Sequence, residues 1–173
     1  YSINAISGYS GGGNALIDRY ENNEGAPVFG AYGLTFNHKH LPEIKTWSGI
    51  NKAPIFVPSV GSFSQGMLTF LPIQLKGEVT MAQLQAKLAD VYASDSFVKV
   101  NDFNAVEDTA APFLTPHGLE NTNLVELSVL GAPDNQSGVL VAKLDNLGKG
   151  ASGAAVQNLN IMLGFAEETA VNL

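Results

Sequence analysis

Two of the three histidines in this sequence, His38 and His40, lie one residue apart and directly before a predicted helix. Pro42 and Glu43 are typical of a helix start, because Pro has no N–H to leave unpaired in the first turn and Glu is stabilised by the N-terminal dipole. Both histidines are therefore expected on the segment that enters the helix, where side chains can face a cleft. Histidine is the side chain most easily poised for proton transfer near neutral pH. The spacing predicts acid–base chemistry.

Structural and metal-binding roles are the alternatives for this pair. Either histidine could cap the helix or lie in a solvated loop, and Glu43 either orients one histidine or only caps the helix. A metal site needs a third and a fourth ligand. His117 is far along the chain, and Asp108 and Glu120 near it form no recognisable ligand set. We rank proton transfer first and metal binding last, and we assign no metal ligand.

A glycine-rich loop, Ser7–Gly13, lies between a predicted strand at 2–6 and a predicted helix at 14–21. A strand, a glycine loop and a helix in this order can expose backbone N–H groups to a phosphate or carboxylate. A tight turn with helix capping is an equally good interpretation. The loop is neither the dinucleotide fingerprint nor a P-loop, because it has neither spacing and no Lys-Ser/Thr pair follows it.

A second turn, Asp145–Gly150, joins the last predicted strand to the last predicted helix. It places the Asn146 amide and the Lys149 ammonium where a strand end meets a helix N-terminus, which is a usual ligand position. Ordinary turn chemistry is the alternative, since Asn and Gly are common turn residues. The six small residues at 150–155 indicate that another backbone or a ligand packs closely against this helix start.

The elements that must position these residues form one α+β domain. Helical spacing and a capping box at Thr80–Gln83 predict a helix over 80–93. The other predicted helices cover 14–21, 42–49 and 151–163, with Gly164 as a stop signal. Strand-like runs cover 2–6, 28–36, 55–60, 67–75, 97–100, 123–130 and 139–144. The last two are expected to form an antiparallel hairpin, and 102–120 is expected to be a long loop.

Composition limits the class of protein. The sequence has 173 residues, of which 45% are hydrophobic and 14% charged, as expected for one globular domain. A net charge of −7 argues against a nucleic-acid partner. No apolar run approaches the roughly 20 residues needed to cross a bilayer, and no signal-peptide pattern is present. We therefore expect no membrane association and a cytoplasmic location.

The sequence contains no cysteine, which excludes disulfides and any thiol nucleophile within these residues. It begins at Tyr1 rather than Met, and 1–7 has the character of a strand end. We therefore expect this sequence to be part of a longer protein.

Four motifs occur in a characteristic order: Ser-Gly-Tyr-Ser-Gly-Gly-Gly at 7–13, His-Lys-His-Leu-Pro-Glu-Ile at 38–44, Pro-Ser-Val-Gly at 58–61 with Gln-Gly-Met-Leu at 65–68, and Leu144–Asn158. Together they resemble the N-acetyl-gamma-glutamyl-phosphate reductase family, especially its shorter variant. The resemblance runs from Tyr1 to about Phe165, which is nearly the whole chain.

The resemblance implies a glyceraldehyde-3-phosphate dehydrogenase-like C-terminal domain, with a mixed, mostly antiparallel sheet and helices packed on one face. It assigns residues 1–173 to the catalytic, substrate-binding and dimerisation domain. The NADP-binding Rossmann domain and the segment with the nucleophilic Cys would then lie outside this chain. A homodimer or homotetramer is expected, and the chain alone is expected to be inactive.

The family reaction reduces N-acetyl-L-glutamyl 5-phosphate with NADPH to the 5-semialdehyde and phosphate in arginine biosynthesis, through a Cys thioester. By resemblance, His38 is the acid/base, and Asn146 contacts the nicotinamide carboxamide of NADP. Six further residues are implied to bind or shape the site for the substrate: Ser7, Gly8, Ser10, Tyr32, His40 and Glu43.

The sequence departs from the family at two positions. Many relatives have Arg or Lys where Asn14 stands, and members of the longer variant have Arg where Gln65 stands. Gln65 suits the shorter variant, whereas Asn14 removes a plausible anion-binding charge, which Lys39, Arg19, Lys149 or the domain outside this chain could supply. The alternatives to this family are a related semialdehyde or acyl-phosphate dehydrogenase and a non-catalytic binding domain of the same fold.

Overall fold

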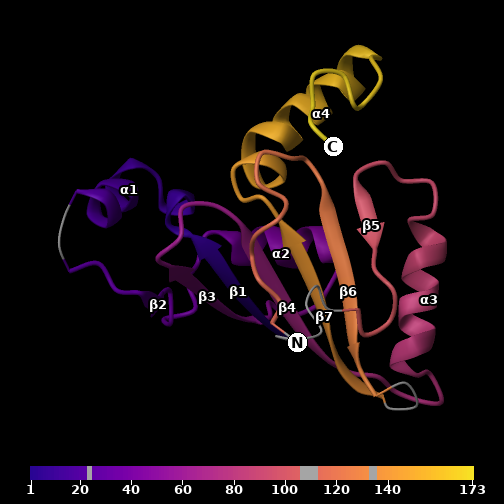
Figure 1. Ribbon diagram of the computed structural model, residues 1–173. Coiled ribbons are helices and arrows are strands. Elements are labelled where there is room, and N and C mark those ends of the chain that lie inside the picture. Colours follow the sequence, from indigo (N-terminus) through magenta and orange to yellow (C-terminus); the bar gives the residue numbers. More distant parts are fainter. Residues whose placement is uncertain (23–24, 106–112, 133–135) are drawn as a thin grey trace.

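A seven-stranded sheet organises the chain in a computed structural model, which describes residues 1–22, 25–105, 113–132 and 136–173. The strand order is β2-β3-β1-β4-β7-β6-β5 (Figure 1). The pairs β1–β3 and β5–β6 are parallel, and the other four pairs are antiparallel. The strands are β1 Ser2–Gly8, β2 Phe29–Ala31, β3 Ile55–Gly61, β4 Met67–Gln74, β5 Val98–Val100, β6 Val125–Gly131 and β7 Ser137–Leu144.

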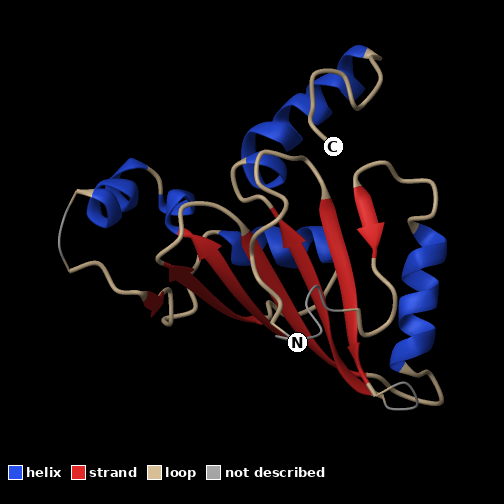
Figure 2. Cartoon of the chain, in the orientation of Figure 1, coloured by secondary structure: helices blue, strands red, loops and turns tan. Residues whose placement is uncertain are grey.

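Four α-helices accompany the sheet in the described residues: α1 Asn14–Glu21, α2 His40–Ser48, α3 Met81–Val91 and α4 Gly153–Leu163. A short 3₁₀ helix, Tyr9–Gly12, precedes α1, and a π-helical turn, Gly148–Ser152, precedes α4. Figure 2 shows α1 and α4 beyond the ends of the strands, whereas α2 lies behind the sheet. The prediction of a mixed, mostly antiparallel α+β sheet is confirmed.

The helices α2 and α3 pack on one face of the sheet. Because side chains alternate along a strand, the β1–β3 register puts Ala5 and Phe56 on the same face. Leu41 of α2 packs with these two residues in a buried cluster. On the same face, Met81 of α3 lies against Gly138 of β7. The other face carries part of the segment between β5 and β6, since that segment's Leu114 lines a cavity of about 210 Å³ with Val141 and Lys143 of β7.

Local sequence signals explain several boundaries. The predicted capping box is present, because the Thr80 hydroxyl accepts from the Gln83 N–H and the Gln83 side chain accepts from the Thr80 N–H. Gly164 ends α4 in the left-handed conformation, with φ of 75°. The predicted hairpin is also present, with β6 and β7 antiparallel from Val125–Leu144 to Gly131–Gly138.

The structure corrects two boundaries near the histidines. The expected strand over 28–36 is only Phe29–Ala31, because Gly33 and Phe36 have positive φ and bend the chain away from the sheet. The helix α2 begins at His40 rather than at Pro42, so His40 is in the first helical turn and only His38 lies before the helix. Pro42 fits there because the first turn leaves N–H groups unpaired.

Within the described residues, no helix is long and apolar enough to cross a membrane.

Candidate functional site

His38 lies on the connection from β2 to α2, over the face of the sheet that α2 covers. Its ring centroid is 5.1 Å from that of Phe56 in a T-shaped contact. Gly33, beside the His38 ring and Pro58, has φ of 61°, a left-handed conformation that favours glycine. The backbone N–H of His40 donates to His38 Nδ1 over 3.2 Å. The first turn of α2 therefore orients the His38 ring.

This hydrogen bond determines which ring nitrogen of His38 carries the proton. A backbone N–H can only donate, so Nδ1 must accept, and in the neutral ring the proton is on Nε2. Burial lowers the pKa of His38, and the positive charges of His40 and Lys39 lower it further. His38 is thus held as a neutral ring with an Nε2–H donor.

Of the predicted substrate residues Tyr32, His40 and Glu43, the structure brings the first two next to His38. The ring of His40 is 4.8 Å from the His38 ring, and that of Tyr32 is 5.9 Å away. Burial raises the pKa of Tyr32, so its hydroxyl stays protonated and can donate. Glu43 is exposed on the first turn of α2, and among the described residues it has no hydrogen bond or ion pair with either histidine.

The glycine loop follows β1 and packs against the β3–β4 turn. The N–H groups of Gly8, Tyr9 and Ser10 donate to the carbonyls of residues 66, 63 and 64 over 2.9, 2.9 and 3.1 Å. These three N–H groups are therefore not open to an anion, in contrast to the expectation from the strand, loop and helix order. Gly8 is required, since a Cβ would lie 2.6 Å from the Gln65 nitrogen.

Asn146 meets the glycine loop at the carboxyl end of β7. Its Nδ2 donates to Ser10 Oγ over 2.9 Å, and its Oδ1 accepts from the Gly66 N–H over 2.8 Å. Gly11 lies beside the amide, where a Cβ would be 3.0 Å from Ser7 Oγ and 3.5 Å from Asn146 Nδ2. The side chains of Ser7, Ser10 and Asn146 therefore converge around a position that lacks a side chain.

The histidine group and the loop group share one face of the sheet. Ser7 of β1 pairs with Val60, and Ala5 pairs with Pro58 in the parallel register. Alternation puts Ser7 on the face that carries Ala5 and Phe56. His38 contacts Phe56 on this face, and Ser7 pairs with Val60, four residues further along β3, so the two groups share the face.

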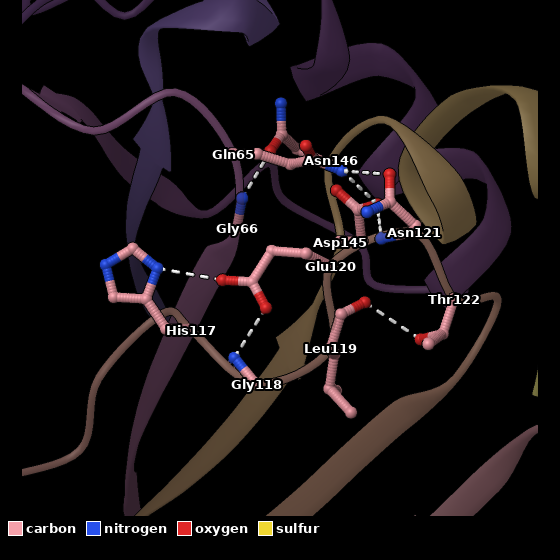
Figure 3. A network of polar contacts seen from close by, with 10 residues as sticks. All are labelled: Gln65, Gly66, His117, Gly118, Leu119, Glu120, Asn121, Thr122, Asp145 and Asn146. Carbon is pink, nitrogen blue, oxygen red and sulfur yellow. Dashed lines mark hydrogen bonds and ion pairs between the residues drawn. The ribbon is translucent and has the colours of Figure 1, made fainter.

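A buried polar network joins residues that the sequence did not single out as a set (Figure 3). Gln65 Nε2 donates to Asp145 Oδ2 over 2.7 Å, and the Asn121 N–H donates to the same oxygen over 2.8 Å. The π-helical turn beyond it packs closely on the chain at Thr122, since a Cβ at Gly148 would collide with the Thr122 carbonyl. Gly148 precedes the six small residues at 150–155, and within those six a Cβ at Gly153 would collide with the Asn123 side chain, so the close neighbour of that stretch is a side chain.

His117 and Glu120 form an ion pair, with 2.9 Å between His117 Nδ1 and Glu120 Oε1. The sequence reasoning did not single out this pair, although its i, i+3 spacing was an available signal, and two such residues are not a metal-ligand set. Hydrogen bonds from its own backbone N–H and from Gly118 lower the pKa of Glu120. Asp108 lies outside the described residues. Within those residues no three His, Asp or Glu side chains gather as a metal site would need.

Known proteins similar to this chain include several reductases. The chain is 44% identical to N-acetyl-gamma-glutamyl-phosphate reductase 2 of Nostoc sp., with 96% of this chain and 55% of the relative covered. It is 46% identical to N-acetyl-gamma-glutamyl-phosphate reductase of Chelativorans sp., with 94% and 54% covered. The chain thus spans about half the length of these curated relatives. They carry the name of the family that the sequence motifs resemble.

Solved structures share the fold. Aspartate-semialdehyde dehydrogenase from Francisella tularensis matches with a TM-score of 0.65 and 16% identity, covering 94% of this chain and 57% of that one. A probable aspartate-semialdehyde dehydrogenase from Pseudomonas aeruginosa matches with the same TM-score of 0.65 and 12% identity, covering 94% and 55%. The family described as semialdehyde dehydrogenase, dimerisation domain, matches residues 1–146. The chain therefore belongs to the family of semialdehyde dehydrogenase dimerisation domains.

Proposed function

We propose that this chain is the catalytic and dimerisation domain of an N-acetyl-gamma-glutamyl-phosphate reductase, which reduces N-acetyl-L-glutamyl 5-phosphate with NADPH in arginine biosynthesis. One observation carries the proposal: 44% identity to a reductase of this name over 96% of the chain. The aspartate-semialdehyde dehydrogenases of similar fold share only 12–16% identity, so they support the fold and not the aspartyl substrate.

The reaction needs groups that these residues do not supply. The sequence has no cysteine, so in this proposal the thiol and the Rossmann region come from polypeptide outside the 173 residues. The thiolate attacks the acyl carbon and the carbon–oxygen bond to phosphate breaks. Phosphate departs, and the acyl group remains on the sulfur as a thioester. NADPH supplies the hydride that reduces this thioester. When the carbon–sulfur bond then breaks, the aldehyde is released and the thiolate is restored.

His38 would stabilise the oxygen that becomes negative in both steps. Its Nε2–H donates toward that oxygen, while Nδ1 is already occupied by the His40 N–H. The neutral ring can therefore hold a strong hydrogen bond to the oxyanion and keep its own proton. We thus narrow the role of His38 from a general acid/base to a hydrogen-bond donor, with Tyr32 and His40 beside it in the substrate pocket.

Asn146 fits a carboxamide partner. After its bonds to Ser10 and Gly66 the amide keeps one N–H and one oxygen lone pair. The missing side chain of Gly11 leaves room beside it. We propose that this amide holds the nicotinamide carboxamide of NADP, and that the hydroxyls of Ser7 and Ser10, with Gly8, face the substrate.

Assembly and location extend the proposal. The matched family is described as a dimerisation domain, which supports a homodimer, with a homotetramer as a higher assembly of it. We place the protein in the cytoplasm, where the substrate would be made.

A choice between two substrates tests the function. The full-length protein, assayed with NADP⁺ and phosphate, should oxidise N-acetyl-L-glutamate 5-semialdehyde at least a hundredfold more efficiently than L-aspartate 4-semialdehyde. A preference for the aspartyl compound would assign a related dehydrogenase instead. Loss of both activities in a folded protein that still binds NADP⁺ would favour a non-catalytic binding domain.

A further inference from the structure

The side chain of Asp145 is a buried carboxylate that accepts hydrogen bonds from N–H groups. It is 0% exposed. Its Oδ2 accepts from Gln65 Nε2 and from the Asn121 N–H, and its Oδ1 accepts from the Leu147 N–H over 3.0 Å. Within the described residues no cation pairs with it. Buried carboxylate oxygens without hydrogen-bond partners are costly in free energy. The three donors are therefore held in fixed positions relative to Asp145.

The two residues at 145 and 146 contact the two residues at 65 and 66 in matching order. The Asp145 carboxylate holds the Gln65 side chain, and the Asn146 amide holds the Gly66 N–H, 2.7 and 2.8 Å respectively. Each contact joins residues 80 apart in the chain. Two adjacent hydrogen bonds therefore join the turn after β7 to the β3–β4 turn (Figure 3).

Contacts that do not involve Asn146 hold Gly66 in place. The Gly66 carbonyl accepts from the Gly8 N–H over 2.9 Å, and a Cβ at Gly66 would collide with the Pro116 carbonyl. The position of the Asn146 amide relative to Gly66 depends on its bond to Ser10 Oγ and on the conformation of the 145–147 turn. The Asp145 carboxylate sets that conformation through Leu147, and it ties the turn to Gln65 and Asn121.

We propose that Asp145 is a positioning residue, which holds the Asn146 amide in register with Gly66 and Ser10 for ligand binding. Asp145 does not reach the ligand itself. The role of Asn146 in binding the carboxamide rests on the proposed function. The geometric part of the inference, that Asp145 controls the Asn146–Gly66 bond, does not.

Hydrogen exchange of single backbone amides tests the geometric part. In ¹⁵N-labelled protein, Asp145→Asn and Gln65→Met should each speed exchange of the Gly66 amide at least tenfold, because its acceptor on Asn146 moves. The amides of β4 should change less than twofold. Asp90→Asn is the matched control, since Asp90 is exposed on α3 and forms an ion pair with Lys87. Unchanged Gly66 exchange in both variants would overturn the inference, and so would equal acceleration of all amides, which would mean general destabilisation.

Kinetics of the full-length enzyme test the link to ligand binding. Asp145→Asn should raise the KM for NADP at least fivefold and leave the KM for the acyl substrate within twofold. The double variant Asp145→Asn/Asn146→Ala should be no worse than Asn146→Ala alone, because a positioning residue acts through Asn146. Additive losses would overturn the inference. If the unaltered enzyme shows no reductase activity, the proposed function fails while the Gly66 exchange still decides the role of Asp145.

Discussion

His38 Nδ1 accepts a hydrogen bond from the backbone N–H of His40, 3.2 Å away. The donor belongs to the first residue of α2, whose N–H groups have no partner within the helix. The helix start thus satisfies one of its own free donors and fixes the ring of the neighbouring histidine. This single contact turns Nε2–H into the only ring group of neutral His38 that can face a substrate.

The donor role of His38 predicts a graded series of variants. His38→Ala in the full-length enzyme should lower kcat by about a hundredfold, the usual scale for losing such a group. His38→Gln should recover part of that loss, because its amide N–H can still donate. The measurement is steady-state turnover of the semialdehyde with NADP⁺ and phosphate.

His40→Ala is the control for that series, since its backbone N–H remains. It should lower kcat by less than tenfold. Full activity in His38→Ala together with a large loss in His40→Ala would assign the role to His40 instead.

The surroundings of His38 predict an acidic titration. Burial, His40 and Lys39 all lower its pKa below the ordinary value of 6.5. The folded protein therefore binds this proton less readily than the unfolded chain does. The stability that depends on neutral His38 is fully present above the ordinary value and is lost as the pH falls from that value through the lower pKa of the folded protein. An NMR titration of the ring protons should give a midpoint below 6.5.

Removing a positive neighbour should move that midpoint upward. His40→Gln should raise it more than Lys39→Gln does, following the order of their effects on His38. Lys45→Gln, further along α2, is the control and should leave the midpoint in place. A midpoint at or above the ordinary value in the unaltered protein would contradict the buried, positively flanked environment.

Close packing predicts that Gly8 cannot carry a side chain. Gly8→Ala would push a Cβ to within 2.6 Å of the Gln65 nitrogen, and it should lower the free energy of unfolding by about 1–3 kcal/mol. Gly30→Ala is the matched control, because its Cβ would meet only the Pro27 ring at 3.4 Å. Urea denaturation followed by circular dichroism compares the two. Equal stability of both variants would contradict the prediction, because it would mean that the glycine loop shifts and accommodates the added Cβ.

The Asn146 amide has two structural partners and, in our proposal, one ligand. Asn146→Ala leaves the Gly66 N–H and the Ser10 hydroxyl without that partner, which should cost about 1–3 kcal/mol of stability. Asn146→Asp keeps an acceptor for both partners but removes the free N–H, so it should fold more stably than the alanine variant and still bind NADP weakly. Asn158→Ala, exposed on α4, is the control. NADP affinity measured by calorimetry separates the two effects, and unchanged affinity in Asn146→Asp would exclude the amide from the ligand contact.

Local signals were sufficient for most of the fold. The bounds of α1 agree with the predicted 14–21, and the capping box placed the start of α3. The strand at 28–36 was overestimated because an apolar run does not show that Gly33 and Phe36 take positive φ. The predicted start of α2 was two residues late. Pro fits any position in the first turn of a helix, so Pro42 does not show which residue begins it.

The site depends on contacts that no local pattern contains. Ser10 and Asn146 meet although 136 residues separate them, and Gln65 meets Asp145 across 80 residues. Each residue type was an ordinary turn residue in its own segment. Only the strand order, which places β1, β4 and β7 side by side, brings the three turns together.

In our proposal, this chain contributes His38 and Asn146 to a reaction whose thiol comes from another region of polypeptide. Phosphate-dependent reduction of NADP⁺ with N-acetyl-L-glutamate 5-semialdehyde, measured side by side for the 173-residue chain and for the full-length protein, tests it most directly. We expect turnover by the full-length protein and none by the chain alone. Turnover by the chain alone would contradict it, because these residues contain no sulfur nucleophile.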